Sequence, residues 1–205
     1  MNTSTLLFTT PQEANIQIAT YKDHLKDLIL HEIANNPTMV MHTDEEICAK
    51  YTSSIVAVRH GKIMWNASIY PTHMHPLTPL VLDWKTIRVG ETWSVIIHAD
   101  VRWYGLGSKL ITKALQTFSS EYDVIVEATV NDIMFVLSIH QWFERIPFPK
   151  ALYEEGKKHL APHMKGKERE FEQKAKCLMY NISLTQKQKN ELITILTQEY
   201  TSHTK

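Results

Sequence analysis

The sequence carries no surplus of either charge. In a chain of 205 residues, 22 lysine and arginine residues balance 22 aspartate and glutamate residues. Such a chain has no long-range field to draw it onto a polyanion or an anionic membrane, which argues against a nucleic-acid or membrane partner. The balance also favours neither a polycationic nor an acidic substrate.

Long apolar runs are missing as well. No stretch approaches the roughly 20 apolar residues that a membrane-spanning helix needs. Residues 1–14 lack the basic end and the long apolar centre of a signal peptide. We therefore expect a soluble, cytoplasmic protein.

Cysteine is scarce, with only Cys48 and Cys177 in the whole chain. They lie far apart and in no metal or redox spacing, which predicts free, buried thiols in a reducing compartment. The chain is long enough for a sizeable core, and we expect a single domain over residues 1–205.

Two histidine pairs have spacings that a metal could use. They are His73 with His75 and His159 with His163. No cysteine or carboxylate cluster completes either set, so we expect surface histidines and no metal.

Apolar spacing and turn residues predict the elements of the first half of the chain. They are a strand within residues 5–9, a helix from Gln12 to Asn36, a short helix opened by the Thr43–Glu46 capping box, and a hairpin of strands 54–59 and 63–70 across His60-Gly61. Residues 71–89 hold three prolines and are predicted to form a long, partly extended connection rather than a regular element.

The second half alternates strands and helices. The expected elements are a strand at 93–99, a helix with apolar positions between Leu106 and Phe118, a strand at 124–130, a helix capped by Asn131 or Asp132 and running to about Arg145, a charged, mostly helical stretch at 151–176, a strand at 176–182, and a last helix opened by Thr185 and Gln188. The helix after Asn131 is apolar nearly all round, which predicts that it is buried.

One junction combines a strand, glycines and a helix. Gly105 and Gly107 follow the strand that ends near Ala99, and the helix begins at once. Unpaired amides and the positive end of the helix dipole would meet there, which is a geometry suited to a phosphate or pyrophosphate. Glycine turns before helices are common, so a purely structural turn is the alternative.

Residues 97–110 resemble the acetyl-CoA signature of the GNAT superfamily of N-acetyltransferases. Its core, Q/R-x-x-G-x-G/A, is met by Arg102, Gly105 and Gly107, and Leu110 matches the flank, whereas Ala99 stands where proline is usual. The resemblance implies an α/β fold of GNAT type, with a mixed, largely antiparallel central sheet flanked by helices. Its core would span residues 5–145, and residues 146–205 would be an elaboration with an extra C-terminal helix.

The resemblance also implies a cofactor, acetyl-CoA, and positions that hold it. Main-chain amides of residues 103–108 would bind the pyrophosphate, residues 95–98 and 126–128 would flank the pantetheine arm, and Asn131 would touch it, unless Asn131 is only a helix cap. The implied cofactor-binding residues are Val95, Ile96, Ile97, His98, Arg102, Trp103, Tyr104, Gly105, Leu106, Gly107, Ser108, Lys109 and Asn131.

Glu91 is the leading candidate for a general base that frees the acceptor amine. It lies eleven residues before Arg102, where a branch of the family resembling histone acetyltransferases has its glutamate base. Without a bulge it would share a strand face with Trp93, Val95 and Ile97, whose apolar surroundings would raise its pKa. A solvated glutamate at the start of a strand is the alternative, and His98 is the second candidate base.

The residue expected to protonate the leaving thiolate departs from the family pattern. Many members have a tyrosine seven residues after the asparagine, and this chain has Ser138 there. Tyr153 or water would then supply the proton, or the thiolate leaves unassisted.

These residues together predict an acetyltransferase that moves an acetyl group to a primary amine within a ternary complex. Two alternatives stay open: a non-catalytic module that binds acyl-CoA, and an acyltransferase acting on a nucleic-acid or aminoacyl acceptor. A homodimer is left open too.

Overall fold

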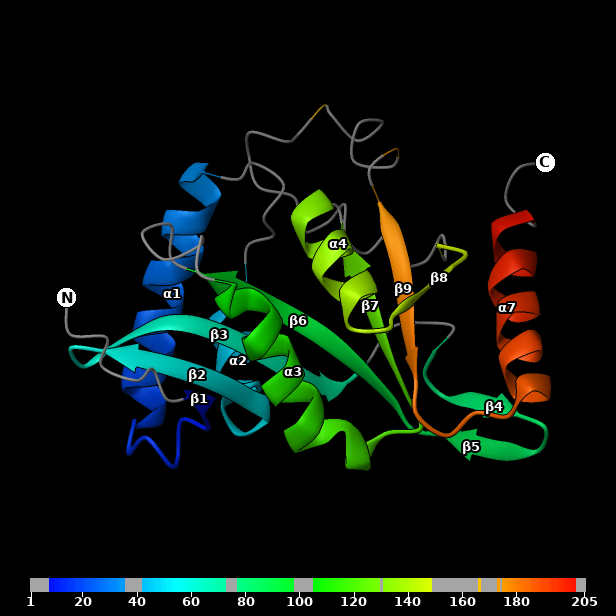
Figure 1. The fold of residues 1–205 in the computed structure, drawn as a ribbon, viewed down its shortest axis with the longest axis horizontal. Coiled ribbons are helices and arrows are strands. Elements are labelled where there is room, and N and C mark those ends of the chain that lie inside the picture. Colours follow the sequence, from blue (N-terminus) through cyan, green and yellow to red (C-terminus); the bar gives the residue numbers. More distant parts are fainter. Residues whose placement is uncertain are drawn as a thin grey trace.

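The computed structural model describes residues 8–35, 42–72, 77–97, 105–129, 131–148, 166, 173 and 175–201. They form a central sheet with helices on both faces (Figure 1). The elements are β1 (Phe8–Thr9), α1 (Ile18–Asn35), α2 (Asp44–Ala49), the 3-10 turn η1 (Tyr51–Ser53), β2 (Ser54–Arg59), β3 (Lys62–Pro71), β4 (Leu80–Leu82), β5 (Lys85–Ile87), β6 (Val89–Ile97), α3 (Leu106–Phe118), the 3-10 turn η3 (Ser119–Glu121), β7 (Val124–Thr129), α4 (Asp132–His140), β8 (Glu144–Ile146), β9 (Lys176–Asn181) and α7 (Gln186–Thr201).

The seven-stranded sheet has the order β1-β2-β3-β6-β7-β9-β8. Its described neighbours pair antiparallel except β6 and β7, which are parallel. The expected mixed, largely antiparallel sheet with a C-terminal helix is therefore confirmed. No helix among the described residues is both long and apolar enough to cross a membrane.

The local signals at the hairpin and the helix starts are confirmed. His60 and Gly61 have φ values of 50° and 75°, the left-handed pair that a two-residue hairpin turn needs. Thr43 and Glu46 form a reciprocal capping box at α2, and Thr185 and Gln188 exchange the equivalent hydrogen bonds before α7.

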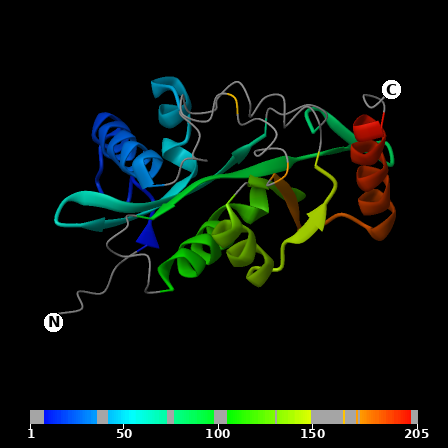
Figure 2. The same cartoon turned by 90° about the horizontal axis from the view of Figure 1, so that it is seen from above.

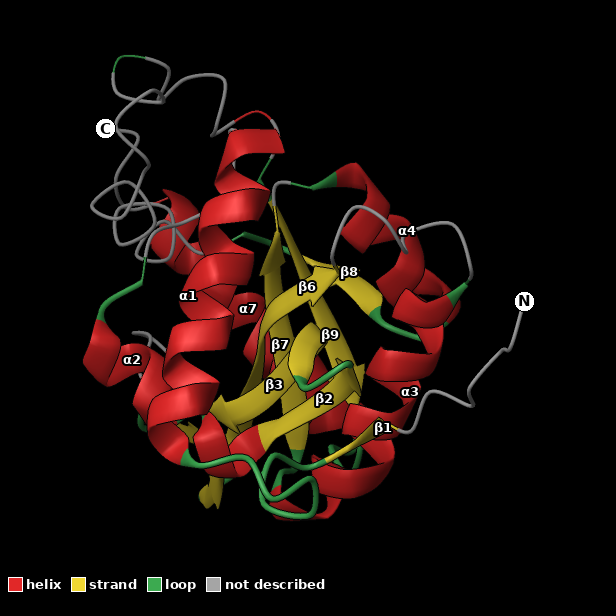
Figure 3. Ribbon diagram, turned by 90° about the vertical axis from the view of Figure 1, so that its left-hand side faces the viewer, coloured by secondary structure: helices red, strands yellow, loops and turns green. Residues whose placement is uncertain are grey.

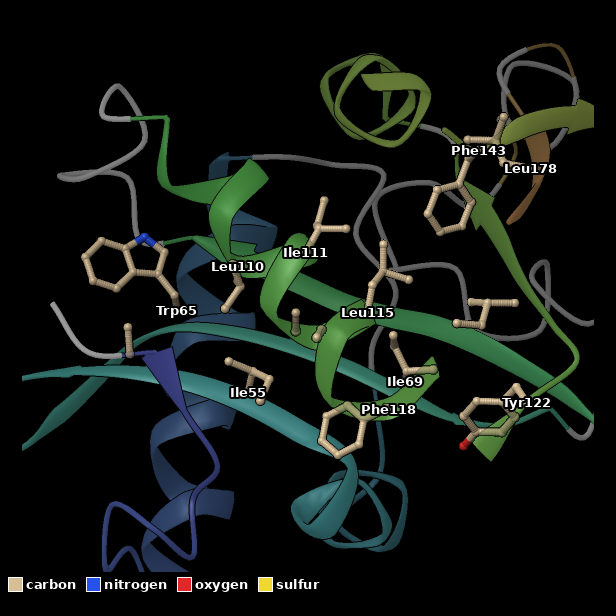
Figure 4. Packing of buried hydrophobic residues seen from close by; sticks show 14 residues of the cluster. Ile55, Trp65, Ile69, Leu110, Ile111, Leu115, Phe118, Tyr122, Phe143 and Leu178 are labelled. Atoms are coloured by element: carbon tan, nitrogen blue, oxygen red, sulfur yellow. The ribbon is translucent and has the colours of Figure 1, made fainter. Parts of the chain in front are cut away.

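Helices α1 and α2 cover one face of the sheet, and α3 and α4 cover the other (Figures 2 and 3). The α3 face holds a cluster in which Trp65, Ile69, Leu110 and Tyr122 are buried (Figure 4). The opposite face carries two clusters, one under α1 and one that includes Leu192 and Leu196 of α7. This second face therefore has two separate cores along one sheet.

Two expectations about the first half of the chain are wrong. The first helix begins at Ile18 and not at Gln12, because Asn15 takes a left-handed φ of 55° and residues 11–15 form turns. Residues 80–87 form a small hairpin instead of an irregular connection. Its turn is formed by Asp83 and Trp84, both at positive φ, and without glycine it gave no strong turn signal.

The next strand also differs from its expected bounds, since β6 begins at Val89 and not at Trp93.

The helix after Asn131 is shorter and more exposed than expected. It ends at His140, and Glu144–Ile146 forms a strand beside β9. Ile133, Val136 and Ile139 are 68%, 51% and 42% exposed, so the apolar character of α4 on all sides does not mean that it is buried. One side of the helix packs against α3 and β7, and its outer side faces solvent.

Asp123, just before β7, joins three connections by hydrogen bonds. Its carboxylate accepts from the Arg88 backbone N (3.0 Å), Arg88 Nε (3.2 Å) and Ser183 Oγ (2.9 Å). The Asp123 carbonyl accepts from the amides of Ile182 and Ser183. The hydrogen bonds from Arg88 hold the pKa of Asp123 well below its usual range.

Asp123→Asn is expected to destabilise the fold by about 1–3 kcal/mol at pH 7, since it removes charged hydrogen bonds to a buried acceptor. A depressed folded pKa contributes stability above the unfolded value of about 3.9, and this contribution is lost as the pH falls below it. Urea unfolding should show a constant difference between wild type and variant from pH 7 to about pH 5, and a shrinking difference as the pH falls from about 5 to 3. Asp83→Asn, which breaks an exposed ion pair with Lys187, is the control and should change stability by less than about 0.5 kcal/mol. An equal effect of the two variants would contradict the prediction.

Candidate active site

Strands β6 and β7 pair over only three residues and then separate. The paired residues are Val89 with Val124, Gly90 with Ile125 and Glu91 with Val126. Beyond Glu91, β6 continues along β3 to Ile97, and β7 continues along β9 to Thr129. Figure 1 shows the two strands diverging from their paired ends. A parallel pair that opens in this way presents unpaired strand edges between which an extended ligand can bind.

Glu91 lies at the last paired position before the strands diverge. It is 7% exposed, and its Oε2 accepts a hydrogen bond from Thr72 Oγ1 at 3.1 Å. Burial raises the pKa of Glu91 to about 7, although hydrogen bonds from Thr72 and Tyr70 and the charge of Lys50 oppose the rise. The expected rise in pKa is thus confirmed, and the solvated alternative is wrong.

Lys50, just after α2, is a second buried group whose charge acts on Glu91. It is 3% exposed, and its Nζ lies 4.8 Å from the centroid of the Tyr70 ring. Burial lowers the pKa of Lys50 to about 6, while the charges of Glu46 and Glu91 oppose that change. Two groups that titrate near neutrality therefore influence each other on the α1 and α2 side of the sheet. The sequence reasoning missed Lys50, because a lysine after a short helix gives no sign of burial.

A β-bulge in β6 changes which residues share the face of Glu91. Ser68 pairs with Trp93 but Asn66 pairs with Ile96, so β6 has one extra residue there. Ile96 is buried with the cluster under α1, whereas Val95 packs on the α3 side. Glu91 and Val95 would share a face only in a strand without a bulge, and β6 does not meet that condition, because the alternation reverses across the bulge.

The glycine loop leads directly into α3. Gly105 has a φ of 65° and occupies the N-cap position, and an added Cβ there would meet no atom within 4 Å. Gly107 is buried, Leu106 and Ser108 are half-buried, and Lys109 is exposed. The first amides of α3 and its dipole are thus available for an anion at a position without a side chain. His98, Arg102, Trp103 and Tyr104 lie outside the described residues.

The remaining sequence candidates are Asn131, Tyr153 and Ser138. Asn131 caps α4, since its Oδ1 accepts from the amides of Ile133 (2.9 Å) and Met134 (3.3 Å). Its cap role is confirmed, and a contact with pantetheine stays a prediction. Tyr153 lies outside the described residues.

Ser138 lies at 0% exposure, inside the fold. Its Oγ donates a hydrogen bond of 2.6 Å to Oε2 of Glu127, a strand residue 4% exposed. Burial raises the pKa of Glu127 to about 7 as well, against hydrogen bonds from Ser138 and Thr92. The sequence reasoning missed Glu127, although an acidic residue inside the apolar run 124–130 was a signal that could have found it.

The described part of the chain has neither a metal-binding cluster nor a disulfide. Within the described residues, no three His, Cys, Asp or Glu side chains come together to hold a metal. Cys48 and Cys177 are both free, and Cys177 is buried whereas Cys48 is partly exposed.

The sheet order, the parallel pair that diverges and the glycine-led helix after it define the GNAT fold. The chain matches the solved NatC complex bound to Gag peptide and CoA with a TM-score of 0.58 and 12% identity, over 87% of this chain and 99% of that one. It matches the polyamine N-acetyltransferase of Drosophila melanogaster, which forms N-acetylagmatine, with a TM-score of 0.57 and 10% identity, over 86% and 100% of the two chains.

A third similar structure is the N-acetylglutamate synthase of Neisseria gonorrhoeae complexed with coenzyme A and N-acetyl-glutamate. The TM-score is 0.50 and the identity 10%, over 79% of this chain and 33% of that one, so this chain spans about a third of the synthase. No protein-family model matches the chain, and no curated protein matches its sequence. Identities this low show a shared fold, and this chain has the fold of the GNAT acetyltransferases.

Proposed function

We propose that the protein is an N-acetyltransferase that moves an acetyl group from acetyl-CoA to a primary amine, with Glu91 as the general base. The observation that carries the proposal is the buried Glu91 carboxyl at the point where β6 and β7 diverge. A carboxyl with a pKa of about 7 is half ionised at neutral pH, which suits a group that must accept a proton and release it again.

The described residues fit an acetyl-CoA molecule at the glycine loop. The left-handed Gly105 leaves open space where a side chain would stand, and the amides that begin α3 point away from the helix. These amides would hold the pyrophosphate, and Arg102 and Lys109 would add positive charge. Acetyl-CoA supplies the acetyl group as a thioester when bound.

Glu91 would act on the amine and not on the thioester. Its side chain lies on the sheet face covered by α1 and α2, opposite the face of α3 and α4. The base would take the proton that the amine loses as it attacks the acetyl carbon. An acceptor is expected to reach Glu91 from the α1 and α2 side, so this side would select the amine.

A cavity of about 310 Å³ lies further along the same sheet, at the ends of β8 and β9. Its lining includes Ile146 and Cys177, which belong to the core cluster on the Glu91 face. The Cys177 thiol has its pKa raised by burial and also by the charges of Glu91 and Glu127, so it lies near both carboxyls. The lining also holds Arg145 and Lys176, so the cavity is cationic and is not itself suited to a protonated amine.

The proposal is tested by calorimetric titration with acetyl-CoA. Wild type is expected to bind, and Gly105→Val is expected to bind about tenfold more weakly, because a β-branched residue resists a left-handed φ. Gly105→Asn is the matched control and should keep the affinity within about threefold, since asparagine tolerates this φ. Equal binding by the valine variant would contradict the role of the loop.

Thiol release in the presence of amines then separates the alternatives. Acceptor-stimulated release of CoA supports the transferase. Binding without any release, over a panel of protein N-termini, lysines, polyamines and small amines, would instead identify a non-catalytic acyl-CoA-binding module. Salt-sensitive binding to polynucleotide would identify the alternative with a nucleic-acid acceptor.

A further inference from the structure

We propose that Glu127 is the general acid that protonates the leaving thiolate, with Ser138 as the residue that positions it. The inference rests on the proposed function and adds to it a residue that the family pattern does not contain. The first observation is a buried oxygen atom, Glu127 Oε1, which has no hydrogen-bond partner among the described residues.

Glu127 lies at the apex of the diverging strands. Glu91 and Val126 are the last paired residues of β6 and β7, so Thr92 and Glu127 are the first residues beyond them. Thr92 Oγ1 lies 3.4 Å from the Val126 carbonyl and 3.3 Å from Glu127 Oε2. A hydroxyl has a single proton to donate, so it is shared between these two acceptors. At the point where β6 and β7 separate, the hydrogen-bonded side chains of Thr92 and Glu127 thus lie on the α3 and α4 side, opposite Glu91.

The two carboxylate oxygens of Glu127 have different surroundings. Oε2 is held by Ser138 Oγ at 2.6 Å and by Thr92, whereas Oε1 has no donor. A buried ionised carboxylate with one bare oxygen is unfavourable, so the neutral acid is the stable form up to about neutral pH. A carboxylic acid with one anchored oxygen and one unpaired oxygen can present its proton at the unpaired one.

Among the described residues, no charged group shifts the pKa of Glu127 or hydrogen-bonds to its carboxyl. Burial keeps the Cys177 thiol of β9 neutral by raising its pKa. On the side of Glu127, β9 also carries the half-buried Tyr180, and β8 carries the exposed Arg145 opposite Leu178, the residue that pairs with Glu127. Helix α4 adds Asp132, which is exposed and paired with Lys176 of β9, and the exposed His140; α3 adds the exposed Lys109 and Lys113. Glu91 of β6 points to the opposite face. The rise in the Glu127 pKa comes from burial and is opposed only by the two hydroxyls.

Two carboxyl groups then account for both proton transfers in the reaction. Glu91 accepts the proton that the amine loses as its nitrogen forms a bond to the acetyl carbon. The carbon–sulfur bond breaks with its electron pair on sulfur, and Glu127 passes its proton from Oε1 to that sulfur. An ordinary thiol has a pKa of about 8.5, above that of Glu127, so this transfer is downhill. Solvent returns a proton to Glu127 and removes one from Glu91 before the next turnover.

The test compares wild type with Glu127→Gln, which keeps the shape of the side chain but cannot deliver a proton. In wild type, kcat/KM should fall above about pH 7 as Glu127 ionises. In the variant, kcat/KM at pH 6.5 should drop by about 30-fold and the fall above pH 7 should disappear, because general acids typically contribute about 10²–10⁴-fold and a thiolate needs less help than most leaving groups. Acetyl-CoA affinity by calorimetry should stay within about threefold.

A second readout does not depend on turnover. The thiol of bound CoA can be titrated by the ultraviolet absorbance of its thiolate. An ionised Glu127 beside it would raise the pKa of that thiol, so Glu127→Gln should lower it by about one pH unit or more. Ser138→Ala deletes one hydroxyl and with it a hydrogen bond that lowers the pKa of Glu127, so it should move the fall in kcat/KM to higher pH.

The outcomes separate this inference from the proposed function. If both variants keep the wild-type pH profile and the bound thiol titrates as before, Glu127 is not the acid, and the transferase still stands. If wild type neither binds acetyl-CoA nor releases thiol with any amine, both proposals fail together. If Glu127→Gln loses the fall in kcat/KM above pH 7 and keeps its affinity for acetyl-CoA, the result supports Glu127 as the acid.

Discussion

Glu91→Gln should lower kcat/KM for a lysine-type acceptor by about 100-fold or more at pH 7, the range that a positioned general base contributes. Glutamine fills the same space and can still accept from Thr72, but it cannot take up a proton. Wild-type kcat/KM should rise as the pH approaches about 7, because Glu91 must be ionised to act as a base. The variant should lose this rise and retain only the dependence set by the amine itself.

The size of the effect should depend on the amine. A lysine-type amine with a pKa near 10.4 needs about 4.6 kcal/mol to be deprotonated at pH 7, whereas an α-amino group near pKa 8 needs about 1.4 kcal/mol. A base is more valuable to the first than to the second. Glu91→Gln should therefore reduce the turnover of a high-pKa amine most, and comparing the two acceptors measures how much of the barrier Glu91 removes.

Stability measurements separate loss of the base from loss of the fold. Burial raises the folded pKa of Glu91 above its unfolded value, so its ionisation opposes folding as the pH rises from about 4.5 through 7. Glutamine removes that penalty, and the variant should be at least as stable as wild type at pH 8. Glu45→Gln, which changes the same charge on an exposed α2 residue, should leave both stability and kcat/KM unchanged. A wild-type pH–rate profile in Glu91→Gln would remove Glu91 from the mechanism.

Much of the fold could be predicted because its signals are local. A glycine pair after a strand, two capping boxes and a His-Gly turn each depend on a few neighbouring residues, and the structure has all of them in place. The strand in which Glu91 lies begins at Val89, four residues before the position that the alternation from Trp93 predicts. The pairing of that strand was not predictable either, since one extra residue in β6 reverses the alternation beyond it.

The candidate site could be predicted only on the β6 side. Glu91 was found because its separation from Arg102 matches the family resemblance. Glu127 and Lys50 were not, because burial of a charged side chain depends on what packs over it from distant elements. Ser138 comes from α4 and Thr92 from β6, and neither adjoins Glu127 in sequence. The polar contacts of this site are therefore a product of topology, which the sequence does not display.

Gly90→Ala should destabilise the protein by about 2–3 kcal/mol, the upper part of the range for overpacking a well-filled core. Gly90 precedes Glu91 in the short stretch that joins β6 to β7. A Cβ at Gly90 would lie 2.8 Å from Cγ and 2.9 Å from Cδ2 of the Tyr122 ring, closer than real contacts allow. Tyr122 is 5% exposed and belongs to the core on the α3 side, so its ring cannot move aside freely.

A double-mutant cycle in urea identifies the ring as the cause. Tyr122→Ala alone should cost about 3–5 kcal/mol, as deletion of a buried aromatic side chain does. Together with Gly90→Ala, the total should be smaller than the sum by about 1–2 kcal/mol, because the added methyl group then occupies space that the ring has left. Gly61→Asn is the matched control: an added Cβ there meets nothing within 4 Å, and its combination with Tyr122→Ala should be additive. If the effects of Gly90→Ala and Tyr122→Ala also add, the Tyr122 ring is not the reason that this position requires glycine. A coupling confined to Gly90 would show that close packing against Tyr122 fixes the last paired residues of β6 and β7, and with them the place where Glu91 and Glu127 face opposite sides of the sheet.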